Sequence, residues 1–196
     1  MLKKYFALAA VCCLLLVTVA PASLAASYEV DTAHSTVGFS VPILGGLSRV
    51  SGKFSDFKAT IVYDEADITK SSVTATIKTA SIDTGIQRRD DHLRTADFFD
   101  AEKYPEITFQ SSRVEKKGKQ LILHGTLTMH GVAKEVAIPF SITGKNTNPD
   151  NKKVVGFAGR LKLNRRDYGI AYTNKNNPTF IGDEIEIELN LITRPS

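Results

Sequence analysis

Alternation of apolar and polar residues at a period of two runs through most of this chain and constrains its fold more than any other feature. In residues 57–63 the odd positions are apolar or aromatic and most even positions are polar. A β-strand points successive side chains to opposite faces, so this pattern predicts a half-buried strand. The same period recurs in residues 73–77, 121–129, 132–142, 157–163 and 185–191. The chain is therefore predicted to be all-β.

Turn signals separate these segments at short intervals. They include Gly45-Gly46, Lys116-Lys117-Gly118, Asn148-Pro149-Asp150 and Asn176-Asn177-Pro178. Short spacings of this kind favour an antiparallel meander over β-α-β units. A sandwich and a barrel both fit the pattern. A closed barrel of about eight strands is favoured because closure removes exposed sheet edges, and Gly52 is expected to allow a bend or bulge in it.

One stretch breaks the alternation. Residues 87–103 predict a short, charged helical insert, which contains the apolar pair Phe98 and Phe99 and is followed by a turn at Tyr104-Pro105. Since the segments on both sides read as strands, the insert is expected to cap one end of a β-structure.

The first 25 residues resemble a cleaved secretory signal peptide. Lys3 and Lys4 precede an apolar run that ends at Pro21 and at small residues, and cleavage is expected after Ala25 or Ala26. The alternatives are a membrane anchor, for which the run is short, and a lipoprotein, for which Cys12 and Cys13 lie too early. The expected location is therefore periplasmic or secreted, with residues 26–196 forming one domain.

Removal of the leader would change the cysteine content and the net charge of the remaining domain. Both cysteines of the chain lie in the leader, so the domain must be held by its core without disulfides. The whole chain has a formal net charge of +4, which falls to +2 when Lys3 and Lys4 are removed. A charge this small is not the footprint of a nucleic-acid-binding protein.

Several blocks, in this order, resemble the signature blocks of the YceI-like family. They are Gly52-x-Phe54, SIDTG at 81–85, RRDDHLRTADFFDAEKYPEITF at 88–109, LTMHGVAKEV at 127–136, Arg166-Asp167-Tyr168-Gly169 and Gly182-Asp183-Glu184. The resemblance runs from Asp31 to the carboxyl end. True lipocalins typically carry a Gly-x-Trp near their first strand, and this chain has no tryptophan.

The resemblance implies a lipocalin-like barrel that sequesters a long-chain isoprenoid, such as a polyprenyl phosphate or a quinone tail, for transport or storage. By the residues alone, the inward apolar stripe favours a filled core. Under the resemblance, the stripe and the two insert phenylalanines line a cavity: Phe39, Val41, Ile61, Ile77, Phe98, Phe99, Phe109, Leu123, Phe140, Phe157, Leu163 and Ile187.

Charged residues of the insert are candidates for binding a lipid headgroup. Guanidinium groups suit phosphate because their donors fork onto two oxygens. The candidates are Arg88, Arg89, His92 and Arg94. The alternative is a solvated helix face neutralised by Asp90, Asp91 and Asp97. For the Arg165-Arg166-Asp167 cluster, a salt bridge at a strand end is favoured over a ligand contact.

The sequence suggests neither a metal site nor an enzyme. The histidines lack the H-x-H or H-x-x-x-H spacing of ligands, and His34 and His130 are each explained by a turn or strand-end hydrogen bond. No nucleophile motif is present, so no catalytic residue and no cofactor is predicted. An enzyme acting on isoprenoid or amide lipids and an interaction module with a filled core remain alternatives. Homodimers and transient membrane contact are compatible with the resemblance.

Overall fold

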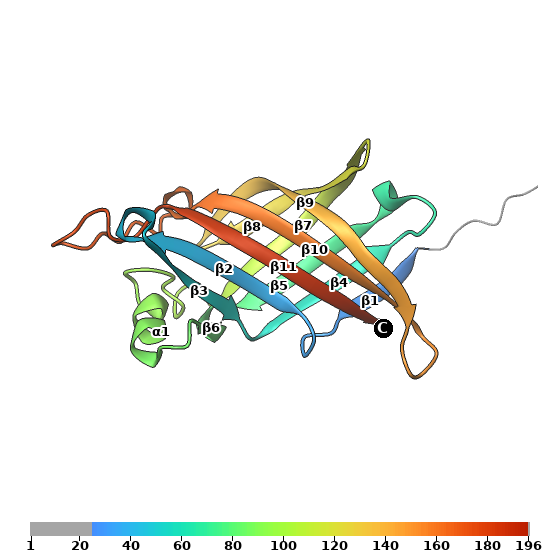
Figure 1. Ribbon diagram of the computed structural model, residues 1–196, viewed down its shortest axis with the longest axis horizontal. Coiled ribbons are helices and arrows are strands. Elements are labelled where there is room, and N and C mark those ends of the chain that lie inside the picture. The colour runs from blue at the N-terminus through green and yellow to red at the C-terminus, as the bar shows by residue number, and fades with distance from the viewer. Residues whose placement is uncertain (1–24, 196) are drawn as a thin grey trace, which may run out of the picture.

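The structure, a computed structural model, describes residues 25–195 and confirms the predicted all-β fold (Figure 1). Eight antiparallel strands form a closed barrel, and each pairs with the next around the wall. In order around the barrel they are β1 (Ala26–Val30), β4 (Phe57–Tyr63), β5 (Ser72–Lys78), β7 (Glu106–Lys117), β8 (Gln120–Met129), β9 (Val132–Thr147), β10 (Lys153–Asn164) and β11 (Glu184–Pro195). The pairing of β1 with β11 closes the ring.

The two ends of the barrel differ because β11 has two partners on one side. Its last residues pair with β1, whereas its first half pairs with β2 (Thr36–Ile43). Strand β2 then pairs with β3 (Ser48–Phe54), and the end of β3 pairs with the two-residue β6 (Ile82–Asp83). Since β3 pairs with neither β5 nor β7, the sheet splays at this end, which we call the mouth.

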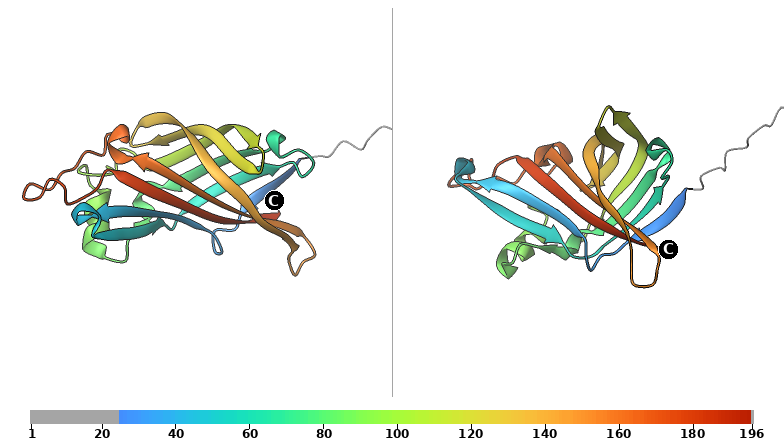
Figure 2. Two further views of the ribbon diagram at one scale, coloured as in Figure 1. Left: turned by 45° about the horizontal axis from the view of Figure 1, so that its top comes forward. Right: turned by 45° about the vertical axis from the view of Figure 1, so that its right-hand side comes forward.

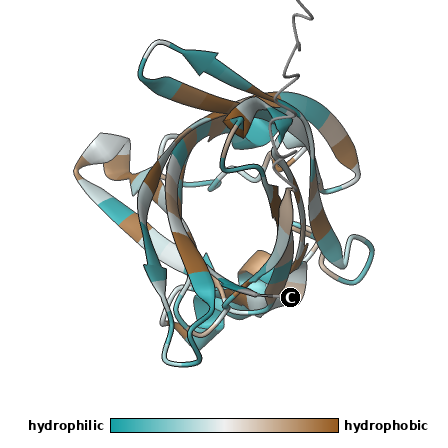
Figure 3. Ribbon diagram, turned by 90° about the vertical axis from the view of Figure 1, so that its right-hand side faces the viewer, coloured by the Kyte–Doolittle hydropathy of each residue, from teal (hydrophilic) through white to brown (hydrophobic). Residues whose placement is uncertain are grey.

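Figure 1 shows which segments lie at each end. The mouth carries the β2–β3 turn, with its 3-10 helix η1 (Leu44–Gly46), the helix α1 (Gln87–Arg94) and the long connection between β10 and β11. Both ends of the described chain lie at the opposite, closed end (Figures 1 and 2). The view along the barrel in Figure 3 shows the ring of strands.

The helical insert is shorter than predicted. Helix α1 ends at Arg94, because Thr95 adopts an extended conformation and its backbone N–H bonds to the carbonyl of His92. Residues 95–104 then form successive turns, in which Phe98 N–H bonds to Thr95 O and Tyr104 N–H to Asp100 O. Two further 3-10 helices, η2 (Ile68–Lys70) and η3 (Thr79–Ser81), flank β5, and η4 (Arg165–Tyr168) follows β10.

The structure has no bulge at Gly52. The β2–β3 register runs without a shift from Val37–Phe54 to Ile43–Ser48. A Cβ on Gly52 would lie 2.5 Å from the Phe39 ring and 2.9 Å from Asp83 O, so this glycine permits a close approach. Register shifts occur instead at Ser111–Arg113 in β7 and at Gly156–Phe157 in β10.

The leader predicted for residues 1–25 lies outside the described residues, apart from Ala25. No helix among residues 25–195 is long and apolar enough to cross a membrane.

The turn between β8 and β9 is a tight hairpin at the mouth. Its two residues, His130 and Gly131, have φ values of 52° and 75°, as a type I′ turn requires. His130 Nδ1 lies 3.0 Å from Tyr168 O, and the Tyr104 ring stacks on His130 with centroids 4.6 Å apart. The turn therefore ties η4 and the end of the insert together.

We expect Gly131→Ala to destabilise the fold by about 1–3 kcal/mol, through the positive φ and a steric clash. A Cβ at this position would lie 2.6 Å from Tyr104 Cε1. Gly118→Ala is the matched control, since Gly118 also has a positive φ of 63° but no atom within 4 Å of a Cβ. Denaturant unfolding of both variants measures the difference, and equal losses would show that the Tyr104 contact contributes nothing.

Candidate ligand-binding site

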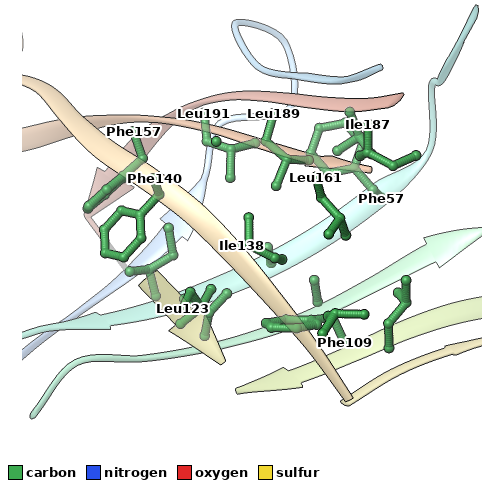
Figure 4. Close-up of a pocket in the computed structure, with 18 of the residues that line it drawn as sticks. Phe57, Phe109, Leu123, Ile138, Phe140, Phe157, Leu161, Ile187, Leu189 and Leu191 are labelled. Carbon is green, nitrogen blue, oxygen red and sulfur yellow. The ribbon is translucent and has the colours of Figure 1, made fainter. Parts of the chain in front are cut away.

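An apolar cavity of about 190 Å³ occupies the interior of the barrel. Inward side chains from neighbouring strands converge on it, as Figure 4 shows for Phe109 of β7, Leu123 of β8, Ile138 of β9 and Leu189 of β11. As far as the chain is described, the side chains around it are apolar except at Ser71, whose hydroxyl accepts a hydrogen bond from Asp64 N at 3.0 Å. We call this space the inner chamber.

Aromatic residues block the inner chamber at the closed end. The Tyr63 and Phe157 rings meet edge to face at 5.9 Å, and the Phe140 ring lies 6.5 Å from Phe157. Val30 and Val155 are 3% exposed and belong to the same core cluster. The closed end of the inner chamber is therefore lined by packed aromatic and aliphatic side chains.

A second cavity of about 740 Å³ lies at the mouth, and we call it the outer chamber. Its walls come from β2, β3, α1, Phe98–Phe99 and residues 170–181 of the connection between β10 and β11. Four residues line both chambers: Phe54, Met129, Leu163 and Ile187. The two chambers therefore adjoin, and the outer one has the size of a typical ligand pocket, roughly 300–1,000 Å³.

Three rings hold the insert against the β10–β11 connection at the mouth. Phe98 and Tyr172 have centroids 4.7 Å apart, and His92 contacts both rings edge to face at 5.0 and 5.2 Å. His92 Nε2 also lies 2.8 Å from Asp97 Oδ2. Since Phe98 comes from the insert and Tyr172 from the other side of the mouth, their contact bridges the opening.

A buried arginine organises the rest of the mouth. The Arg165 side chain is 5% exposed, and its Nη2 lies 2.7 Å from Asp183 Oδ1. Its Nε donates to Gly182 O, and its Nη1 donates to Ile170 O and Tyr172 O at 2.8 and 3.0 Å. Burial lowers the pKa of the Arg165 guanidinium below the usual value, an effect that the Asp183 charge opposes. Arg165 thereby fastens both ends of the segment that carries Tyr172.

Comparison with known proteins places this barrel in a family. The family model described as YceI-like domain matches residues 28–193. The chain belongs to the YceI-like family. It is 38% identical to Protein YceI of Escherichia coli O157:H7 over 153 residues, which are 77% of this chain and 80% of that relative.

Solved structures of similar proteins show the same architecture. Burkholderia cenocepacia BcnA superposes with a TM-score of 0.75 at 27% identity, covering 84% of this chain and 99% of BcnA. A polyisoprenoid binding domain from Saccharophagus degradans superposes with a TM-score of 0.65, covering 86% of this chain and 98% of that domain. At 15% identity, the latter shows a shared fold.

In this YceI-like barrel, every apolar residue predicted to line a cavity does line one of the chambers. Ile61, Ile77, Phe109, Leu123, Phe140 and Phe157 line the inner chamber. Phe39, Val41, Phe98 and Phe99 line the outer chamber, while Leu163 and Ile187 line both. That these positions hold a ligand stays a prediction.

The four charged residues predicted to bind a headgroup differ in where their side chains lie. Arg88, Arg89 and His92 line the outer chamber, whereas Arg94 does not. Arg94 donates to Ala80 O and Ile82 O, so it fastens α1 to the barrel wall. Arg89 is partly engaged, since it donates to Thr84 Oγ1 at 2.7 Å and to Thr84 O at 2.9 Å.

Arg88 differs from the other three candidates. It is exposed, and it forms no hydrogen bond or ion pair with any residue among 25–195. Its guanidinium is therefore fully available to an anionic group at the mouth.

The remaining histidines take structural roles. His34 Nδ1 lies 2.8 Å from Asp31 Oδ2, and His124 Nε2 lies 2.8 Å from Glu115 Oε2. No group of three or more His, Cys, Asp or Glu side chains gathers within residues 25–195 in a way that could hold a metal. The predicted salt bridge at Arg165-Arg166 is present, as both arginines contact Asp183.

Sequence reasoning missed the β10–β11 connection as part of the site. Ile170, Tyr172, Asn174, Phe180 and Ile181 all line the outer chamber. The available signal was the set of large apolar residues that interrupt a polar run rich in Asn and Thr. Because these residues follow no strand or helix period, the pattern gave no reason to place them around a cavity.

Proposed function

We propose that this protein binds one long-chain isoprenoid lipid, with the end of the tail in the inner chamber of about 190 Å³ and the rest of the molecule, headgroup included, in the outer chamber of about 740 Å³. The observation that carries the proposal is the apolar interior, which adjoins a chamber bordered by Arg88, Arg89 and His92. Each CH₂ group moved from water into such a space contributes about 0.8 kcal/mol. A long tail therefore supplies affinity without polar contacts.

Relatives support the ligand class. The domain from Saccharophagus degradans that shares this fold is described as polyisoprenoid binding. A space lined by aliphatic side chains selects its ligand by length and width, so the headgroup is distinguished at the mouth. The protein thus serves as a carrier or store, acting in the periplasm after its leader is removed, with no chemical step of its own.

The cavity also bears on the alternative of an interaction module. A module that works through its loops has no need of an interior space, and its inward stripe would be packed solid as in most small domains. Here the stripe surrounds a cavity. A carrier accounts for that space, whereas a filled-core module does not.

Mass spectrometry tests the carrier function. The protein is purified without detergent from the cells that make it, weighed in its native state, and then extracted with organic solvent. We expect one isoprenoid per chain, and the extract identifies the headgroup. A protein that is reproducibly empty and takes up neither added polyprenyl phosphate nor quinone would refute the proposal.

Loss of the ring contact across the mouth should release the lipid faster. In Phe98→Ala the Phe98–Tyr172 contact at 4.7 Å is removed. Aromatic pairs contribute about 0.5–1.5 kcal/mol beyond their buried area, so release should be several-fold faster. Dissociation of a fluorescent isoprenoid analogue measures the rate.

The control for this variant is Tyr28→Ala. Tyr28 is also 8% exposed, but it lies in β1 and lines neither chamber. Both variants are expected to lose stability, whereas only Phe98→Ala should speed release. Equal release rates in the two variants would show that Phe98 does not retain the ligand.

A further inference from the structure

Exposed apolar side chains gather at the mouth. Among residues 25–195, the large apolar side chains classed as exposed are Leu44, Leu47 and Ile86, at 44%, 88% and 53% exposure. Isolated exposed apolar residues are common on protein surfaces. Here all three lie on segments that border the same opening, since Ile86 and the neighbour of Leu44, Ile43, line the outer chamber.

The turn that carries the two leucines is held in place. Leu44, Gly45 and Gly46 all have positive φ values, which make the tip of the β2–β3 hairpin sharp. Leu44 N–H bonds to Phe180 O at 2.9 Å, and Ile43 forms a β-bridge with Ile181. The backbone is thus braced from inside the mouth, while the Leu47 side chain stays in water.

Unpaired positive charge accompanies these side chains. Arg88 lies two residues beyond Ile86, and Lys175 lies in the β10–β11 connection; both are exposed and neither has a partner among the described residues. Three acidic residues of the insert are engaged, because Asp90 accepts a hydrogen bond from Thr84 N–H, Asp91 pairs with Arg94 and Asp97 pairs with His92.

These features fit a lipid surface better than a protein partner. A specific protein interface buries about 800 Å² on each partner, which three separate side chains cannot supply. Apolar side chains flanked by basic ones are the pattern of proteins that bind anionic membranes. We infer that the β2–β3 tip and Ile86 insert into the surface of an anionic membrane and seat the mouth of the barrel against it.

The test uses the chain from Ala26 onward, because the apolar leader would itself bind lipid. Sedimentation with phosphatidylcholine vesicles, with and without phosphatidylglycerol, measures the partition coefficient. Wild type is expected to bind, more strongly to the anionic vesicles and less at high salt. Leu44→Glu/Leu47→Glu is expected to lower binding by about tenfold or more.

A matched double variant controls for added charge. Gln120→Glu/Thr147→Glu introduces two carboxylates in exposed positions at the closed end and should bind vesicles almost as wild type does. Equal loss in both double variants, or a wild type that binds neither kind of vesicle, would overturn the inference.

The inference does not depend on the identity of the bound lipid. Neither Leu44 nor Leu47 lines a chamber, so Leu44→Glu/Leu47→Glu should contain as much lipid as wild type by mass spectrometry. Vesicle binding by a protein that proves empty would support docking while refuting the carrier function. A protein that contains lipid but does not bind vesicles would support the carrier function and refute docking.

Discussion

Gly159→Leu is expected to weaken lipid binding in the barrel. Gly159 faces the inner chamber from the middle of β10, where a Cβ would lie 3.4 Å from Ile138 Cγ2 and 3.7 Å from Leu189 Cδ1. A leucine side chain built from this point projects into a space of only about 190 Å³. Displacing two CH₂ groups of a tail costs about 1.6 kcal/mol, so affinity should fall at least about tenfold.

The matched control is Gly144→Leu, which adds the same side chain to the outer surface. Gly144 is exposed in β9 and has no atom within 4 Å of a Cβ. Lipid content by mass spectrometry and thermal unfolding are measured for both variants. If folded Gly159→Leu retained lipid as Gly144→Leu does, the tail would lie somewhere other than the inner chamber.

Arg165→Met is expected to cost about 2–4 kcal/mol of folding free energy. Methionine replaces the apolar stem but leaves Ile170 O, Tyr172 O and Gly182 O without the donors that now reach them. It also leaves Asp183 with one cationic partner fewer. Denaturant unfolding gives the free energy, and limited proteolysis should show faster cleavage within residues 170–181.

Arg166→Met is the control, because Arg166 binds the same carboxylate from outside. Its Nε donates to Asp183 Oδ2 at 2.8 Å, but its side chain is 42% exposed. Exposed ion pairs contribute little, so the loss should stay below about 1 kcal/mol. A loss equal to that of Arg165→Met would mean that the buried hydrogen bonds of Arg165 add nothing to its ion pair.

The strands could be predicted because the alternation of apolar and polar residues lies within each strand's own sequence. In β4, the alternation of Phe57, Ala59, Ile61 and Tyr63 with more polar residues follows directly from the pleat, and these four side chains are buried. The identity of the inward face was therefore set by the sequence pattern. The pattern did not show whether that face surrounds a cavity, since a filled core and an apolar chamber require the same alternation.

The polar part of the site was harder to predict because it depends on contacts between distant segments. Arg94 and Arg88 look equivalent in the sequence, yet the carbonyls of Ala80 and Ile82 engage the first and nothing described engages the second. The role of Arg165 likewise depends on contacts with Asp183 and with the carbonyls of Tyr172 and Gly182, which the sequence does not place beside it. Composition indicates that such groups exist, but only the fold decides which of them stay free.

The aromatic block at the closed end imposes an order on loading and unloading. Under the proposed function, the rings of Tyr63, Phe140 and Phe157 at that end leave the mouth as the route for a long molecule, which enters tail first and leaves headgroup first. The depth of the barrel then acts as a ruler, and a tail that exceeds it must fold back or protrude. Under the proposed carrier function, an acceptor then contacts the headgroup while the tail is still shielded from water.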